Sequence, residues 1–158
     1  MQESKEGAVR APRPGTSAVS RAKLMERIRA LHAEWMPILG LGDWTDQSYV
    51  CEEPDGKTYA EVEKMQWEYK RFAIRYFPDL ALHDDDFLEA IVLHELIHVL
   101  RDPERRLLFD LIDQVDTEED DLGETLREFY RMHDERLTTE LAHALIRARR
   151  AGRGCDKT

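Results

Sequence analysis

The segment His94-Glu95-Leu96-Ile97-His98 places two imidazoles and a carboxylate within five residues. On an α-helix, residues four apart lie on one face, so His94 and His98 can bind a single Zn²⁺ ion. Glu95 lies beside them, where a general base is needed. The spacing is typical of metal-dependent hydrolases and predicts a zinc site with Glu95 as its catalytic residue.

The motif lies within an apolar segment that runs from Phe87 to Leu100. A helix that is apolar nearly all round is buried, and a buried ionisable side chain is costly unless it is paired or ligated. Zinc would supply the partner that His94 and His98 need. The alternative, a chance motif on an ordinary core helix, is rare at background residue usage. Acidic residues at 84–86 predict the start of this helix, and Pro103 predicts its end.

Composition limits the classes of function. The 158 residues, 42% of them hydrophobic, suffice for one domain with a modest core. With 23 Lys and Arg against 33 Asp and Glu, the net charge of −10 argues against nonspecific nucleic-acid binding. We expect a cytoplasmic protein without a membrane partner, because no signal region or bilayer-length apolar stretch is evident. Cys51 and Cys155 do not indicate a disulfide framework or a cysteine metal site.

Three parts are expected along the chain: a disordered arm at 1–19, one domain at 20–150 and a flexible tail at 151–158. Within the domain, helical periodicity predicts a first helix from Ser20 to about Trp35, with a core stripe of Leu24, Ile28, Leu31 and Trp35.

Three segments after this helix read as strands. They are Trp44–Cys51, Tyr59–Met65 and Lys70–Phe77, and they predict a small three-stranded sheet, most simply a meander, with Glu68 in its last turn. The motif helix follows, then a shorter helix from Pro103 to Ile112. An acidic linker between Asp113 and Glu124 is expected as a solvated loop, with a calcium loop as the weaker alternative, and leads to a final helix from Leu122 to about Arg150. The predicted fold class is α+β.

A catalytic zinc site usually takes three protein ligands, so a third must be found. The sequence after His98 lacks the H-x-x-G-x-x-H extension of the metzincins. Glu135 shares a helix face with apolar neighbours, as a buried ligand requires. Glu140 is explained by an ion pair with Arg136, yet it also flanks an apolar stripe. Helical spacing therefore leaves the choice open among the candidates of the final helix, which are His133, Asp134, Glu135, Glu140 and His143.

From Arg21 to Ile146 the chain resembles the small zincin-like metallopeptidases of bacteriophages and prophages, sometimes called minimal gluzincins. Besides the histidine motif, the resemblance is carried by four segments, which are 35–41, 60–62, 69–74 and 134–142. In that family a Glu is followed by an aliphatic residue three positions on and by Leu-Ala at six and seven. The pattern maps onto Glu135, Thr138 and Leu141-Ala142, with Thr138 departing from it. The resemblance implies a zincin-like fold and Glu135 as the third ligand.

A site of His94, His98 and Glu135 predicts peptide-bond hydrolysis, in which zinc activates a water molecule and Glu95 takes its proton. The substrate would be a protein or peptide aligned on the edge of the sheet. Tyr130 and His133 are candidate oxyanion helpers, although a packed aromatic ring and a solvated histidine explain them more simply. Two other functions are compatible with the sequence: a noncatalytic zincin-fold binding module, and a zinc hydrolase of small amides or esters. The sequence does not indicate the oligomeric state.

Overall fold

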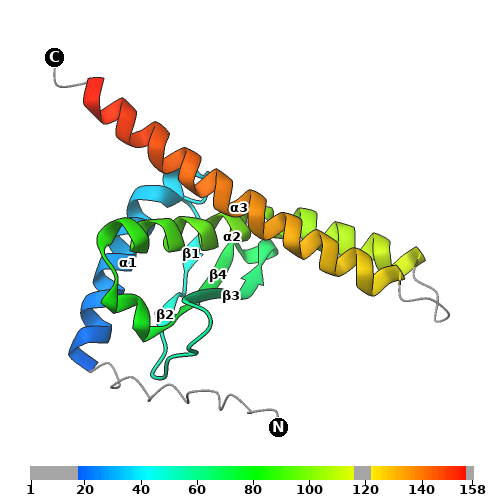
Figure 1. The fold of residues 1–158 in the computed structure, drawn as a ribbon, viewed down its shortest axis with the longest axis horizontal. Helices are drawn as coiled ribbons and strands as arrows, with labels where there is room; N and C mark the ends of the chain where they lie inside the picture. Colours follow the sequence, from blue (N-terminus) through cyan, green and yellow to red (C-terminus); the bar gives the residue numbers. More distant parts are fainter. Residues whose placement is uncertain (1–17, 116–121, 156–158) are drawn as a thin grey trace, which may run out of the picture.

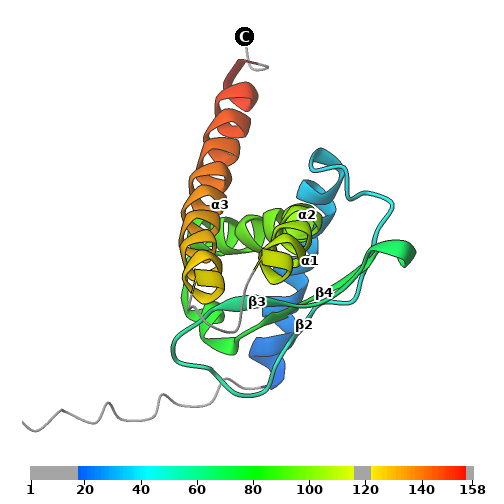
Figure 2. The same cartoon turned by 90° about the vertical axis from the view of Figure 1, so that its right-hand side faces the viewer.

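The computed structural model describes residues 18–115 and 122–155, which form three long helices and a small sheet. Helix α1 spans Ala18–Ile38, α2 spans Asp85–Val115 and α3 spans Leu122–Cys155. Helix α2 lies between α1 and α3 and packs over the sheet (Figures 1 and 2). The expected α+β class is confirmed at this level. No described helix combines the length and the apolar character needed to cross a membrane.

The sheet is mixed, and its central strand is β4 (Arg71–Tyr76). Strand β3 (Ala60–Gln66) pairs with it in antiparallel fashion, with an irregularity between Val62 and Lys64. Two short strands, β1 (Thr45–Asp46) and β2 (Tyr49–Val50), pair with β4 in parallel. Glu68 lies in the short 3₁₀ helix between β3 and β4, as expected.

The predicted meander has the wrong strand order, because the first segment joins β4 and not β3. The connection from Cys51 to Tyr59 is long enough to cross β4, whereas a meander needs a tight turn there. The first predicted strand, Trp44–Cys51, is also interrupted at Ser48, between β1 and β2. Ser48 accepts a hydrogen bond from the Ile74 amide on its hydroxyl, at 3.0 Å, while its own amide donates to Asp46 at 2.8 Å.

Helix α1 contributes the expected core stripe, since Leu24, Ile28 and Trp35 are fully buried. A polar network ties the same helix to the sheet. The ring of His32 contacts Asp46 at 2.6 Å through Nδ1 and the Tyr76 hydroxyl at 2.8 Å through Nε2. His32 and Tyr76 are buried, so these contacts are shielded from water.

Helix α2 does not end at Pro103, and the separate helix expected from 103 to 112 is its continuation. Asp102 explains the continuity. Its carboxylate is buried and accepts hydrogen bonds from the Trp67 indole at 3.2 Å and from Arg105 at 2.8 Å. An acidic residue followed by proline is a favourable start for a helical turn, so the helix resumes where proline interrupts its hydrogen bonding. The predicted beginning is confirmed, because Asp84 accepts the Phe87 amide at 2.8 Å.

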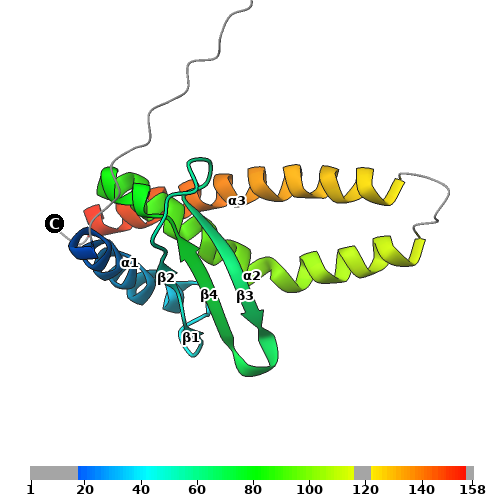
Figure 3. The ribbon, with the colours of Figure 1, turned by 90° about the horizontal axis from the view of Figure 1, so that it is seen from below.

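Helix α3 runs antiparallel to α2, and the two extend beyond the sheet as a long helical hairpin (Figure 3). It continues to Cys155, past the expected end near Arg150 and into the segment expected as a tail. Arg150 binds Glu89 of α2 at 2.8 Å, and the Arg149 guanidinium lies over the Trp35 ring at 4.7 Å. These contacts hold the C-terminal half of α3 on the body. Of the arm expected at 1–19, residues 18 and 19 belong to α1 and the rest lies outside the described residues. Of the acidic linker expected between Asp113 and Glu124, both ends are helical, and 116–121 lies outside the described residues.

Candidate metal centre

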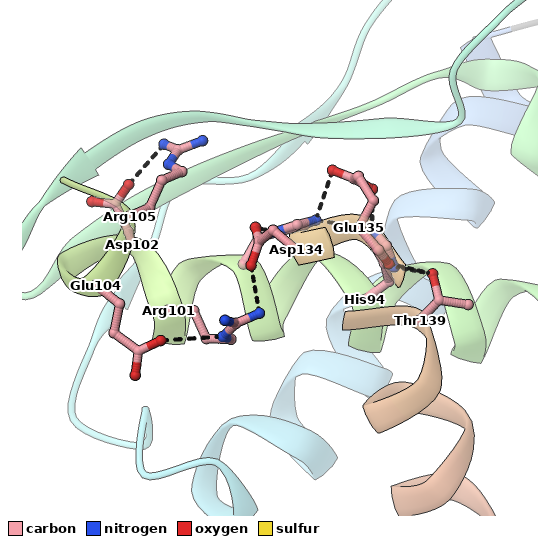
Figure 4. Close-up of polar contacts among 9 residues, drawn as sticks. His94, Arg101, Asp102, Glu104, Arg105, Asp134, Glu135 and Thr139 are labelled. Atoms are coloured by element: carbon pink, nitrogen blue, oxygen red, sulfur yellow. Dashed lines mark hydrogen bonds and ion pairs between the residues drawn. The ribbon is translucent and has the colours of Figure 1, made fainter. Parts of the chain in front are cut away.

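Two helices bring three metal-ligating side chains to one point: α2 supplies His94 and His98, and α3 supplies Glu135. The two Nε2 atoms lie 2.9 Å apart. One carboxylate oxygen of Glu135 lies 3.2 Å from His94 Nε2, and the other lies 3.3 Å from His98 Nε2. Figure 4 shows Glu135 and His94 facing each other across the two helices. Among the described residues, this is the group of His, Cys, Asp and Glu that could hold a metal ion.

The other candidates of α3 do not join the cluster. Glu140 forms an ion pair with Arg136 at 2.9 Å, and the His133 ring packs against Phe129 at 4.5 Å. His143 lines the neighbouring cavity but is not among the three clustered residues. Glu135 itself is 63% exposed, so the expectation of a buried ligand is wrong. The face it borders is nevertheless buried, as expected, through Thr138, Ala142 and Ile146.

Each histidine also has a polar contact at its Nδ1 atom, besides the contacts of Nε2 within the cluster. The carboxylate of Asp134, itself buried, lies 3.3 Å from His98 Nδ1 and forms an ion pair with Arg101 (Figure 4). The Thr139 hydroxyl lies 3.3 Å from His94 Nδ1 and donates its proton to the Glu135 carbonyl oxygen at 2.9 Å. Its oxygen is therefore free to accept the His94 Nδ1 proton. Both contacts favour the tautomer that carries its proton on Nδ1 and turns the Nε2 lone pair toward the cluster.

With both protons on Nδ1, the cluster consists of three acceptors, and a cation or a proton must lie among them. When a proton takes this place, on Nε2 of His94 or of His98, the hydrogen bond that it makes to Glu135 lowers the pKa of that carboxyl well below its ordinary value. Zinc ligands at about 2.0–2.1 Å in a tetrahedron are roughly 3.3 Å apart. The three separations, 2.9, 3.2 and 3.3 Å, are close to that value. Two imidazoles and a carboxylate therefore fit a divalent transition metal such as zinc.

Glu95 lies beside this cluster and is 7% exposed. Burial raises the pKa of its carboxyl to about 7, although the neighbouring His94 and a hydrogen bond from the Val62 amide lower it. A carboxyl with such a pKa can both accept and donate a proton near neutral pH. The side chain reaches from α2 toward β3, so it joins the cluster to the edge of the sheet.

A cavity of about 770 Å³ opens over the cluster and is lined by β3, α2 and α3. Its walls include Ala60, Glu61 and Val62 of β3, His94, Glu95 and His98 of α2, and Glu135 of α3. Among the described residues, β3 pairs with β4 alone. The main chain of β3 on the side away from β4 therefore borders the cavity next to Glu95.

The two candidate oxyanion helpers have different positions. Tyr130 lines the cavity, but its hydroxyl is buried and has no hydrogen-bond partner among the described residues. Burial also raises the pKa of this hydroxyl. His133 does not line the cavity. Neither side chain presents a donor to the cluster in this conformation.

Sequence reasoning missed the groups that orient the histidines. Asp134 was considered only as a ligand, and Thr139 and Arg101 were not considered. Helical spacing is the signal that could have found them. Thr139 follows Glu135 by four residues and Arg101 follows His98 by three, so each shares a face with a ligand.

Comparison of the chain with protein-family models, with curated proteins and with solved structures gives no match. The chemistry of this centre is therefore argued from its own geometry.

Proposed function

We propose that the protein is a zinc-dependent metallopeptidase, with His94, His98 and Glu135 as the zinc ligands and Glu95 as the general base. One observation carries the proposal. Three potential ligand atoms converge beside the buried carboxylate of Glu95, and the Nδ1 atoms of both imidazoles face acceptors, on Asp134 and Thr139, that favour a proton at Nδ1. A helix that merely carried the motif in its core would not need oriented imidazoles or a carboxylate from a second helix.

Bound zinc would supply Lewis acidity, which lowers the pKa of a water molecule and polarises the scissile carbonyl. The protein's own part is proton transfer and positioning. Glu95 lines the cavity beside the ligands, so its carboxylate can accept a proton from water and deliver it to the leaving amine. Burial keeps that carboxylate away from competing solvent.

The shape of the cavity favours an extended peptide as substrate. It is open, and it runs along β3, whose main chain can bind a peptide by strand addition. A hydrolase of small amides would be better served by an enclosed pocket. An edge strand beside the motif helix, with a late helix supplying the glutamate, also agrees with the zincin-like fold that the resemblance implies, and we propose that fold.

The first experiment measures metal content per chain by plasma mass spectrometry, on protein purified without chelator or immobilised nickel. Wild type and Glu140→Ala should each hold about one zinc per chain, and Glu135→Ala should hold much less. Glu140→Ala is the matched control, because this exposed glutamate lies on the same helix outside the cluster. Wild type without zinc would contradict the metal centre.

The second experiment tests hydrolysis with a diverse peptide library and mass-spectrometric detection of products. Wild type should cleave peptides, and Glu95→Gln should retain zinc but lose cleavage. Retained zinc without cleavage in either protein would favour the binding module. Cleavage of small amides or esters alone would favour the nonpeptidase hydrolase.

A further inference from the structure

The hairpin of α2 and α3 carries large apolar side chains that the described part of the chain leaves exposed. Met132 and Leu141 of α3 are exposed, and so are seven others that lie together by helical spacing: Leu100, Leu107 and Leu111 of α2, and Leu122, Leu126, Phe129 and Leu137 of α3. The exposed fractions are 62% for Leu107, 59% for Phe129 and 51% for Leu122. Monomeric soluble proteins rarely expose a contiguous apolar patch larger than a few hundred Å².

These seven side chains share one face of the hairpin, here called the apolar face. Spacings of seven and four residues align the α2 leucines, and spacings of four, three and eight align Leu122, Leu126, Phe129 and Leu137 of α3. A small cavity lined by Arg101 of α2 and by His133 and Leu137 of α3 lies on the same side. None of the apolar-face residues lines the cavity of the metal centre. The apolar face and the metal centre therefore lie on different sides of the hairpin.

The segments outside the described residues contain few large apolar side chains. Residues 1–17 contain Met1 and Val9 as their only large apolar side chains. The segments 116–121 and 156–158, Asp-Thr-Glu-Glu-Asp-Asp and Asp-Lys-Thr, contain none. These segments therefore offer little apolar surface with which to cover the face.

We propose that the occupant is a second copy of this chain, and that two hairpins pair face to face about a two-fold axis as an antiparallel four-helix bundle. In this arrangement α3 lies along α3 of the partner and α2 along α2 of the partner. The exposed apolar side chains amount to roughly 600 Å² on each copy, at on the order of 150–200 Å² per fully exposed side chain. A stable interface needs about 800 Å² per partner. A polar rim around the apolar face would have to supply the remainder, about 200 Å² on each copy.

The exposed apolar residues of α2 and those of α3 are centred at about the same level along the hairpin, so both sets allow the same two-fold axis. Phe109 packs against Tyr130 with ring centroids 5.8 Å apart, and Asp113 pairs with Arg127. Residues near 106 of α2 are therefore level with residues near 132 of α3. The α2 leucines, from 100 to 111, are centred near 106, and the α3 residues, from 122 to 137, are centred near 130, within about one helical turn of the same level. One two-fold axis can thus relate both sets.

Charge favours the antiparallel arrangement over the parallel one. The sequence from 110 to 124 includes eight Asp and Glu and no Lys or Arg. Arg147, Arg150 and Arg153 lie toward the other end of α3, where the last two pair with Glu89 and Glu34. Parallel pairing would bring two acidic tips together in a protein whose net charge is already −10. Antiparallel pairing separates the tips and directs each toward the more basic end of the partner's α3.

Sedimentation velocity on the full-length chain over a range of concentrations tests the dimer. The sedimentation of wild type should give a molecular mass twice that of the 18.5 kDa monomer. Leu126→Asp/Phe129→Asp should weaken dimerisation at least about a hundredfold, because charges would be buried in the interface. Leu82→Asp is the matched control, since Leu82 is 71% exposed but lies in the 3₁₀ helix before α2, outside the apolar face. Circular dichroism checks that each variant remains helical.

Cysteine cross-linking tests the arrangement, in a Cys51→Ser/Cys155→Ser background. His133→Cys should cross-link two chains, because residue 133 lies next to the axis. Leu122→Cys should not, because two copies of residue 122 would be roughly 30 Å apart along antiparallel helices. The reverse pattern would overturn the antiparallel pairing. A monomeric wild type, or an Asp variant that still dimerises, would overturn the proposal. Dimerisation only after removal of residues 1–17 would assign the apolar face to that segment.

Discussion

Asp134→Asn is the sharpest test of how the metal centre is built, because the change alters charge and leaves side-chain volume nearly constant. The Asp134 carboxylate lies 3.3 Å from His98 Nδ1 and is 6% exposed, so its charge is little screened by water. An asparagine oxygen can still accept the Nδ1 proton, but the charge-assisted part of the contact is lost. We therefore expect zinc affinity to fall about 10- to 100-fold, or about 1.4–2.7 kcal/mol.

The neighbouring residues set the controls for this measurement. Thr139→Val removes a neutral acceptor from His94 and should weaken zinc by a smaller factor. Glu140→Gln changes an exposed charge of the same helix outside the cluster and should leave zinc affinity unchanged. Arg101 loses one partner in Asp134→Asn but keeps Glu104 at 3.4 Å, so the helix pair should remain folded.

Zinc affinity can be measured by competition with a chromophoric chelator, together with urea unfolding of the metal-free proteins. If Asp134→Asn remains folded and binds zinc within twofold of wild type, the argument that Asp134 orients His98 is refuted. If Glu140→Gln weakens zinc as much as Asp134→Asn, the effect is general electrostatics of α3 and not orientation.

Three further predictions concern stability. Thr138→Val should raise the free energy of unfolding by about 1 kcal/mol, because the Thr138 hydroxyl is buried and has no hydrogen-bond partner in the part of the chain that the structure describes; urea unfolding that shows a loss would contradict this. Pro103→Ala should raise it by about 1–3 kcal/mol by restoring a backbone donor inside α2, and an unchanged urea midpoint would show that the helix is already relaxed around the proline. Asp46→Asn should destabilise the protein at neutral pH. Burial alone would raise the pKa of Asp46, but hydrogen bonds with His32 and Ser48 outweigh it and lower that pKa, so the contribution is present above about pH 4. This stabilisation is lost as the pH falls through the lowered pKa. Unfolding curves at several pH values should show that the difference in free energy of unfolding between wild type and Asp46→Asn narrows in acid. A constant difference would argue against this origin.

Local sequence patterns correctly predicted the buried face of the first helix and the start of the motif helix. The spacing of Leu24, Ile28 and Trp35 identified the buried face of α1, and Asp84 identified the start of α2. These features depend on residues a few positions apart, where helical geometry fixes the relation between side chains. The same logic failed at Pro103, because Asp102 is held by Trp67 from the distant β3–β4 connection. The predicted order of the strands was wrong for a similar reason, because the periodicity of the strands does not encode the path of the loop across β4.

By itself, the sequence determined that His94 and His98 share one face of a helix with Glu95 next to them, because a four-residue spacing has that consequence on any α-helix. It left Glu135 and Glu140 as open alternatives, since both lie on α3 and periodicity allowed either. The tertiary structure brings only one of these two glutamates to the histidines. The packing of α3 against α2 turns Glu135 toward the histidines and leaves Glu140 paired with Arg136. That same packing brings Asp134 and Thr139 to the Nδ1 atoms, because two helices far apart in sequence meet at one fixed rotation.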